Sequence, residues 1–149
     1  MQLTKFSDYS LRLLLYLAER PETSSTIGDI AQWYGISKPH LVKVAHNLVK
    51  LGYVNSSQGK GGGLRLAKPP EKINIATLVR HTEPDFHVVE CFDKARNTCR
   101  ITQNCKLKHV LHEATRAFFQ SLEKHTLASI ASLHQTIKPK KGEYNGIVV

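Results

Sequence analysis

The sequence predicts a mainly α-helical fold: a winged helix-turn-helix domain with a small β-hairpin wing and a long C-terminal dimerisation helix. Three observations predict it. Two amphipathic segments are joined by a short turn that contains glycine, a basic glycine-rich hairpin follows at once, and a long apolar stripe comes later in the chain. The chain has 149 residues, 41% of them hydrophobic and 22% charged, which is typical of one folded domain with a modest extension.

The first predicted helix spans residues 9–18. Its leucines and alanine form one broad apolar stripe, and Arg12 lies on the opposite side. Ser7 or Asp8 is the expected N-cap, because both side chains accept hydrogen bonds from the first backbone amides of a helix. Pro21 ends the segment.

The helix-turn-helix follows. A short helix is expected at 27–34 after Thr26, and Gly35 supplies the left-handed residue that closes it. Ser37 is expected to cap the next helix, 38–51, whose apolar residues recur at helical spacing over its whole length. A generic helical hairpin would share this pattern, so the segment after it decides the fold.

That segment predicts a wing. Tyr53 and Val54 begin a short strand, residues 58–63 form a glycine-rich tip, and residues 64–66 alternate as a returning strand. The alternative is a phosphate-binding nucleotide loop, but such a loop needs a helix directly after it. Here the two consecutive prolines at 69–70 prevent one.

The C-terminal half predicts one long helix. A short helix is expected near residues 73–79, residues 83–104 read as irregular, and a helix of about eighteen residues begins at Cys105. Its apolar stripe needs a partner surface, which either a second copy of the chain or the winged domain itself would supply. One more helical turn or two is expected at 126–134, before a loose tail that begins at Lys138.

The predicted organisation therefore has three parts. They are a DNA-binding unit at 1–70, with the helix-turn-helix at about 28–51 and the wing at about 53–67, a cysteine loop and dimerisation helix at 71–128, and a flexible extension at 129–149.

Charge indicates the partner. Twenty-one Lys and Arg residues against twelve Asp and Glu give a net charge of +9, and six basic residues but no acidic one lie between Asp29 and Glu71. This is the pattern of a nucleic-acid binder, although a solvated basic face or a membrane-surface protein would share it. The residues expected to contact double-stranded DNA lie early in the second helix of the motif and on the wing: Ser37, Lys38, His40, Lys43, Lys60 and Arg65.

Other classes fit less well. The longest stretch without a charged residue, 125–137, is too short and too polar to span a bilayer, and the N-terminus has no secretory signal, so a cytoplasmic protein is expected. None of the eight histidines pairs with a Ser or Cys at a spacing that suggests a catalytic triad. We therefore expect a binding protein rather than an enzyme, with a metal-dependent enzyme as the distant alternative.

Three cysteines, Cys91, Cys99 and Cys105, are the only ones in the chain and lie within fifteen residues. In a cytosolic protein such a group indicates metal binding or redox sensing rather than disulfides. Three thiolates leave a tetrahedral zinc or an iron–sulfur cluster one ligand short. The spacing alone leaves a cluster, zinc and a free-thiol sensor open.

The chain resembles the Rrf-type iron–sulfur winged-helix regulators, and within them the nitric-oxide-sensing repressors. The resemblance is carried over residues 1–128 by LTKFSDYSLRLLLYLA, ISKPHLVKVAHNLVKLGYV, the wing GKGGGLRLA and the three cysteines. It implies a homodimer with crossing C-terminal helices that binds an inverted repeat in operator DNA and releases it in response to nitric oxide. It also implies one iron–sulfur cluster per subunit, 4Fe–4S being favoured over 2Fe–2S.

The resemblance implies the cluster ligands as well. The three cysteines bind iron, and Asp8 of the other subunit supplies the fourth ligand. A related branch instead uses a His three residues after the last cysteine, where this chain has Lys108, with His109 one residue further on. Two departures stand out: seven residues separate Cys91 from Cys99 where four or five are usual, and Gln58 replaces a basic residue before the wing glycines.

Overall fold

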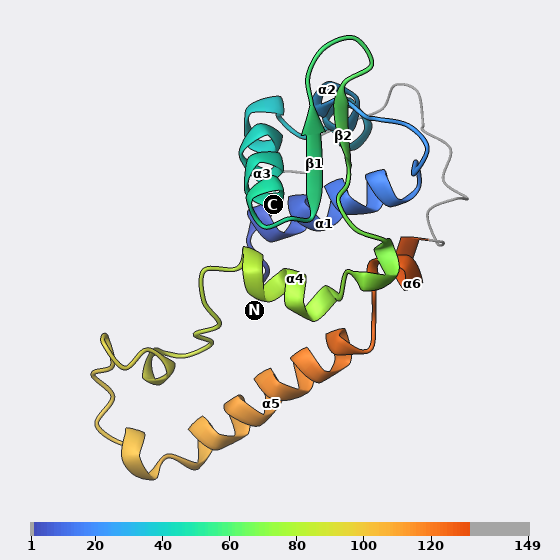
Figure 1. Ribbon diagram of the computed structural model, residues 1–149. Helices are drawn as coiled ribbons and strands as arrows, with labels where there is room; N and C mark the ends of the chain where they lie inside the picture. The colour runs from blue at the N-terminus through green and yellow to red at the C-terminus, as the bar shows by residue number, and fades with distance from the viewer. Residues whose placement is uncertain (1, 132–149) are drawn as a thin grey trace.

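A computed structural model describes residues 2–131 and confirms the predicted fold class (Figure 1). The described chain is mainly helical, with one two-stranded antiparallel sheet and three short 3-10 turns at 70–72, 90–92 and 102–104. Its helices and strands are α1 (Lys5–Ala18), α2 (Ile27–Tyr34), α3 (Lys38–Lys50), β1 (Val54–Ser57), β2 (Gly63–Leu66), α4 (Ile75–Thr82), α5 (Lys106–Glu123) and α6 (Leu127–Ala131).

Helix α1 begins four residues earlier than the sequence indicated, and neither predicted cap is used. Thr4 is the N-cap, and its side chain accepts a hydrogen bond from the Ser7 amide. Ser7 is buried and Asp8 lies in the first turn. The predicted apolar stripe, built from the leucines and one alanine, did not include Phe6, which packs against the core and extends the stripe toward the N-terminus.

The helix-turn-helix forms as predicted. Thr26 and Asp29 make a capping box at the start of α2, and the two hydrogen bonds from Thr26 lower the pKa of the Asp29 carboxyl. Gly35 closes α2 with φ 64°, in the left-handed region. Ser37 occupies the N-cap position of α3, but its side chain makes no capping hydrogen bond. Helix α3 therefore relies on its buried face for stability.

The wing is anchored to the segment that precedes α2. In the β1–β2 hairpin Val54 pairs with Leu66 and Ser57 with Gly63. The Ser24 hydroxyl donates to the Gly61 carbonyl over 2.7 Å, and Ser25 and Leu64 exchange backbone hydrogen bonds. The tip at residues 58–62 thus projects from a fixed base.

One hydrophobic core joins the DNA-binding unit to α4 and α6. Leu14, Ile30, Leu41 and Leu48 are fully buried where α1, α2 and α3 meet. Helix α6 adds Leu127, also fully buried, and packs against α1. Residues 129–131, which the sequence analysis assigned to the flexible extension, therefore belong to a packed helix. The rest of that extension lies outside the described residues.

Helix α5 divides into two halves. Its C-terminal half packs against the rest of the chain, where Phe119 is only 7% exposed and packs edge-on against Phe86. Its N-terminal half projects away from the domain, and Leu107 and Val110 are 63% and 58% exposed (Figure 1). None of the helices in residues 2–131 is long and apolar enough to cross a membrane.

Candidate functional site

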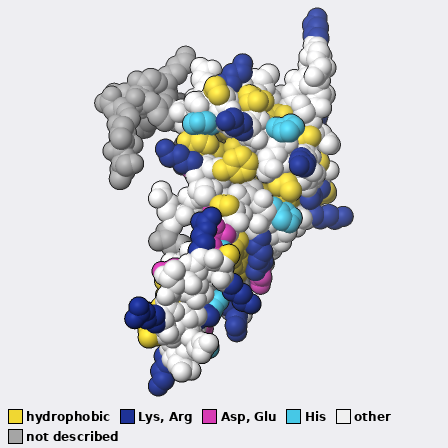
Figure 2. Space-filling model, turned by 90° about the vertical axis from the view of Figure 1, so that its left-hand side faces the viewer, with side chains coloured by type: hydrophobic (Ala, Val, Ile, Leu, Met, Phe, Trp, Pro, Cys, Tyr) yellow, Lys and Arg dark blue, Asp and Glu magenta, His cyan; other side chains and the backbone are white. Residues whose placement is uncertain are grey.

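The first candidate site is the outer face of α3. Leu41, Val44, Ala45 and Leu48 hold the helix to the core, which leaves its other side facing solvent. On that side the four predicted contact residues are all exposed: Ser37, Lys38, His40 and Lys43. Figure 2 shows this side of the molecule, with Lys, Arg and His side chains over its upper part and acidic side chains only lower down.

The wing extends the same basic surface. Lys60 and Arg65 are both exposed, one in the tip and the other on β2 opposite Asn55. In Figure 2 the wing projects from the upper edge of the face and carries a basic side chain at its end. All six predicted DNA-contact residues are thus accessible on two neighbouring elements.

Two features of this face escaped the sequence analysis. Val42 points outward from α3 and is 45% exposed, an apolar side chain suited to contact a thymine methyl group. The signal for it was a valine on the polar side of an otherwise regular amphipathic helix. In addition, the His40 ring lies 6.4 Å from that of Tyr9, so the start of α3 contacts α1 one residue after Asp8.

The second candidate site is the cysteine loop. Its three thiols are free, Cys99 being exposed and Cys91 and Cys105 partly buried. Four basic side chains around them are exposed: Lys94, Arg96, Arg100 and Lys106. Within residues 2–131, no group of three or more His, Cys, Asp or Glu side chains is gathered closely enough to hold a metal ion. Ligation by all three thiols would therefore require the loop to contract.

The loop nevertheless has defined internal contacts. Phe92, beside Cys91, stacks on His112 of α5 with ring centroids 3.8 Å apart and planes 5° from parallel. Cys105 is the N-cap residue of the same helix, where the helix dipole favours a negative charge. Three free thiols in one basic loop that is fixed to a helix N-terminus are a donor set that fits a thiolate-ligated metal or cluster.

The residues on both sides of Cys99 also form hydrogen bonds within the loop. The Glu90 carboxylate accepts hydrogen bonds from both the amide and the hydroxyl of Thr98, the residue before Cys99. These bonds lower the pKa of Glu90. On the other side, the Thr102 hydroxyl donates to the Cys99 carbonyl over 2.7 Å.

Asp8 lies in the first turn of α1, in a different part of the chain from the cysteine loop. It forms an ion pair with Arg12 at 2.8 Å, and both side chains are about two-fifths exposed. The i, i+4 spacing of these two residues could have predicted the pair from sequence. Asp8 lines an open hollow beside Gln2 and Leu3.

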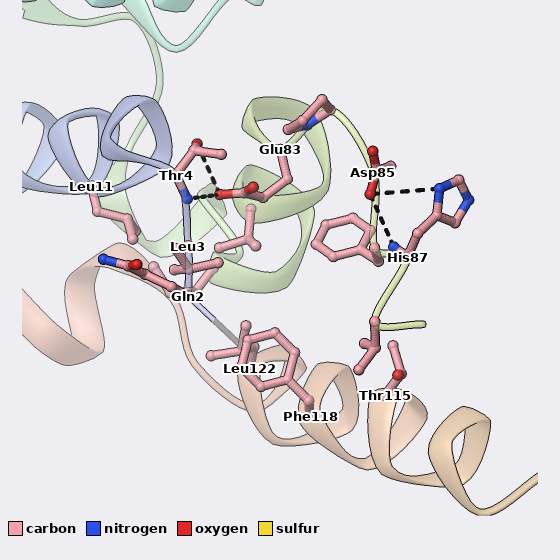
Figure 3. A pocket seen from close by; sticks show the side chains of 15 residues that line it. Gln2, Leu3, Thr4, Leu11, Glu83, Asp85, His87, Thr115, Phe118 and Leu122 are labelled. Carbon is pink, nitrogen blue, oxygen red and sulfur yellow. Dashed lines mark hydrogen bonds and ion pairs between the residues drawn. The ribbon is translucent and has the colours of Figure 1, made fainter. Parts of the chain in front are cut away.

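An apolar pocket of about 540 Å³ adjoins that hollow and shares Gln2, Leu3 and Leu11 with it. Figure 3 shows Phe118 and Leu122 of α5 facing the pocket from one side and Leu3 and Leu11 from the other. The Glu83 carboxylate closes one end, where it accepts a hydrogen bond from the Thr4 amide at 2.8 Å and another from its hydroxyl.

The last turn of α4 also contacts the base of the wing. The Tyr53 hydroxyl lies 2.9 Å from Nδ1 of His81, and the Lys68 ammonium lies 4.2 Å from the centre of the Tyr53 ring. Burial raises the pKa of Tyr53. His81 and Glu83, two residues apart, thus tie the segment that enters the cysteine loop to the wing and to the start of α1. The sequence offered no signal for either contact.

Comparison with known proteins agrees with this geometry. The chain is 51% identical over 138 residues to the HTH-type transcriptional regulator NsrR of Bacillus subtilis, which covers 92% of this chain and 94% of the relative. It is 50% identical over 131 residues to NsrR of Shouchella clausii, with 87% and 88% covered. Both relatives are named as transcriptional regulators, which agrees with the expectation of a protein that is not an enzyme.

Solved structures agree on the fold. The global cysteine regulator CymR of B. subtilis matches with a TM-score of 0.69 at 22% identity, over 89% of this chain and 98% of that one. IscR of T. potens matches with a TM-score of 0.72 at 22% identity, over 95% and 94%. The profile of the Rrf2 family, described as iron-dependent transcriptional regulator, matches residues 3–132. The chain therefore belongs to the Rrf2 family of transcriptional regulators.

Proposed function

We propose that this protein is a cytoplasmic, nitric-oxide-sensitive transcriptional repressor whose DNA binding depends on an iron–sulfur cluster. It binds an inverted-repeat operator as a homodimer and releases it when nitric oxide reaches the cluster. The observation that carries the proposal is that one chain has two sites. One is the exposed basic face formed by α3 and the wing, which we call the reading face, and the other is a loop with three free thiols that contacts α5. The NsrR relatives at 44–51% identity support the same function.

Cys91, Cys99 and Cys105 would hold the cluster, one per subunit. The three free thiols match the donor set that a cluster with one non-cysteine ligand requires. A 4Fe–4S cluster is favoured over 2Fe–2S because a single oxygen ligand leaves one iron more open to attack. When bound, the cluster supplies iron to which nitric oxide can attach.

The homodimer is supported by two complementary surfaces. Leu107 and Val110 of α5 are exposed, and so is Ile101 at 66% just before them. On the same chain, an apolar pocket lies open beside Leu3 and Phe118. In a two-fold dimer, the exposed apolar start of α5 of each subunit would lie in the apolar pocket of the other subunit.

This arrangement accounts for the role of Asp8. The hollow that Asp8 lines shares residues with the apolar pocket, so a partner helix in that pocket brings its own cysteine loop toward Asp8. Asp8 of one subunit then serves as the fourth ligand of the other, with His109 as the alternative. To do so, Asp8 gives up part of its contact with Arg12.

Contacts within the chain give the route from the cluster to DNA. Tyr9, next to Asp8, contacts His40 at the start of α3, so a shift of the first turn of α1 reaches the reading helix. His81 and Glu83 connect the start of the cysteine loop to the wing and to Thr4. A small change in the spacing of the two reading helices is enough to weaken binding, because half-site separation is fixed by geometry.

A second candidate is a zinc-stabilised or thiol-based redox regulator on the same scaffold. It is favoured by the accessibility of Cys99, which is exposed and free. Zinc is colourless, whereas an iron–sulfur protein absorbs visible light. The spectrum of anaerobically purified protein therefore separates the two candidates.

The decisive experiment combines that spectrum with iron and sulfide analysis of four proteins: the wild type and the Cys91→Ser, Cys99→Ser and Cys105→Ser variants. We expect visible absorption in the wild type, and its loss or strong oxygen sensitivity in each variant. Far-ultraviolet circular dichroism should stay unchanged, because none of the three cysteines belongs to the hydrophobic core. A colourless wild type that contains zinc would refute the iron–sulfur proposal.

A further inference from the structure

We propose that Glu90 is a positioning residue for the cysteine site: by binding Thr98, its carboxylate holds Cys91 and Cys99 together across the long first gap of the loop. The inference deepens the proposed function, on which it rests in assigning metal binding to these cysteines. It assigns a role to a carboxylate that the sequence analysis left unassigned.

The geometry of the contact carries the inference. Glu90 immediately precedes Cys91, and Thr98 immediately precedes Cys99. One oxygen of Glu90 accepts hydrogen bonds from both the amide and the hydroxyl of Thr98, the latter at 2.7 Å. We call this pair the Glu90–Thr98 latch. Because Glu90 directly precedes one cysteine and Thr98 directly precedes the other, the latch limits how far apart the two cysteine backbones can move.

The latch also accounts for the unusual spacing. Seven residues lie between Cys91 and Cys99, and an open loop of that length would let the two thiols separate widely. With the latch closed, the intervening residues form a side loop that is tied internally. The Ala95 amide donates to the Asp93 carboxylate and the Cys99 amide donates to Asn97. The effective separation of the thiols is then set by the latch and not by the number of residues.

The Cys91 side of the latch contacts α5, and the Cys99 side contacts the 3-10 turn that directly precedes this helix. On the Cys91 side, Phe92 stacks on His112 of the helix. On the Cys99 side, the Thr102 hydroxyl accepts a hydrogen bond from the side-chain amide of Asn97 and donates one to the Cys99 carbonyl. Cys105 begins the helix itself. The latch is therefore the contact that joins the first two cysteines to each other, while neighbouring contacts join them to the third.

Cobalt binding to the apo-protein tests the latch without any assay of repression. Cobalt(II) bound by thiolates gives a charge-transfer band whose rise reports affinity. In Glu90→Ala we expect the affinity for Co²⁺ to fall roughly tenfold, the lower end of the effect seen when a group that orients metal ligands is lost. Glu90→Gln, which keeps an acceptor oxygen for Thr98, should recover most of it.

Asp93→Ala is the matched control. Asp93 is also an acid of this loop and binds a backbone amide, but it bridges no two cysteines. It should leave the Co²⁺ affinity within about twofold of the wild type. Equal losses in the Asp93 and Glu90 variants would overturn the latch, because they would show a general effect of loop charge or order.

A second measurement needs no metal. In Cys105→Ser, mild oxidation by diamide joins Cys91 to Cys99 as a disulfide, and diamide takes up the two thiol hydrogens. Adding Glu90→Ala should slow this step roughly two- to tenfold, the effect of losing one or two hydrogen bonds. An unchanged rate would overturn the latch.

The outcomes separate the two proposals. If the wild type and Glu90→Ala bind Co²⁺ through their cysteines with equal affinity, the latch is refuted and the proposed function stands. Wild-type protein that binds no metal through its cysteines refutes the proposed function. In that case the latch cannot position metal ligands either, and this holds for any rate of disulfide formation.

Discussion

At the scale of single residues, Lys43 tests the assignment of the reading face. It is exposed on α3 on the side away from the core, two turns before the helix ends. We expect Lys43→Glu to weaken binding to an inverted-repeat operator by at least about fivefold, since one specific contact is worth roughly 1–3 kcal/mol. Fluorescence anisotropy with labelled duplex measures this.

Lys50→Glu is the control for that variant. It makes the same charge reversal on the same helix, but in the last turn, away from the N-terminal half that enters the groove. If both variants weaken operator binding equally, net charge governs affinity and the assigned face is wrong.

Lys60 should behave differently from Lys43. It lies in the exposed wing tip, where a phosphate contact would carry no sequence information. We expect Lys60→Gln to lower affinity for specific and nonspecific duplexes alike and to reduce the slope of log K against log salt by about 1. A loss confined to the operator sequence would show instead that the wing reads bases.

Sequence reasoning predicted that the candidate DNA-contact side chains are exposed, but it did not predict the side-chain contacts that fix the wing and the cysteine loop. Charge and helical period identify Lys43 without a structure, since both are local properties. The Glu90–Thr98 latch and the Tyr53–His81 hydrogen bond join residues 8 and 28 positions apart. No local pattern encodes such pairs, because they depend on how the loop and α4 pack.

At the scale of elements, Gly62 tests whether the shape of the wing tip matters for DNA binding. A Cβ on Gly62 would lie 2.5 Å from the Ser57 carbonyl oxygen and 2.9 Å from the Gln58 carbonyl carbon, both backbone atoms. Gly62→Ala must therefore displace the tip. We expect several-fold weaker DNA binding with little loss of thermal stability, because the tip buries little.

Gly28→Ala is the control for the wing variant. In α2 an added Cβ would meet only Thr26 Oγ1 at 3.4 Å, so it is tolerated and raises helix stability by roughly 0.5–1 kcal/mol. DNA affinity should stay at the wild-type value. Thermal melts monitored by circular dichroism measure the stability of both variants, and the binding assay measures their DNA affinity. Wild-type DNA affinity in Gly62→Ala would contradict this account.

The elements show where sequence prediction succeeds. Helix α2 was predicted to the residue because Thr26 and Gly35 mark both of its ends. Helix α1 was predicted four residues short, because its cap, Thr4, stands further upstream than Ser7 and Asp8, which were expected to cap it. Helix α6 was foreseen as a turn or two, but its burial against α1 is a tertiary effect that no local pattern shows.

At the scale of the whole molecule, the proposed homodimer would use the projecting half of α5 as its interface. Val110 is 58% exposed there, with Leu107 one turn earlier. We expect Val110→Glu to raise the dimer dissociation constant by at least about 30-fold, the effect of losing about 2 kcal/mol at a buried interface position. Analytical ultracentrifugation measures this.

Gln120→Glu is the matched control, since it adds the same charge at an exposed position on the packed half of α5. It should remain dimeric. A dimeric Val110→Glu variant would place the interface elsewhere and would remove the argument that Asp8 reaches the partner's cysteine loop.

The central claim is that nitric oxide controls DNA binding through a cluster held by the three cysteines. The most direct test is the operator affinity of anaerobically purified, cluster-containing protein before and after addition of nitric oxide, with Cys99→Ser protein as the reference. We predict a fall in affinity of roughly 5- to 150-fold in the wild type, the usual range of coupling between two sites, and no response in the variant. An operator affinity that nitric oxide leaves unchanged in cluster-containing wild-type protein would contradict the account.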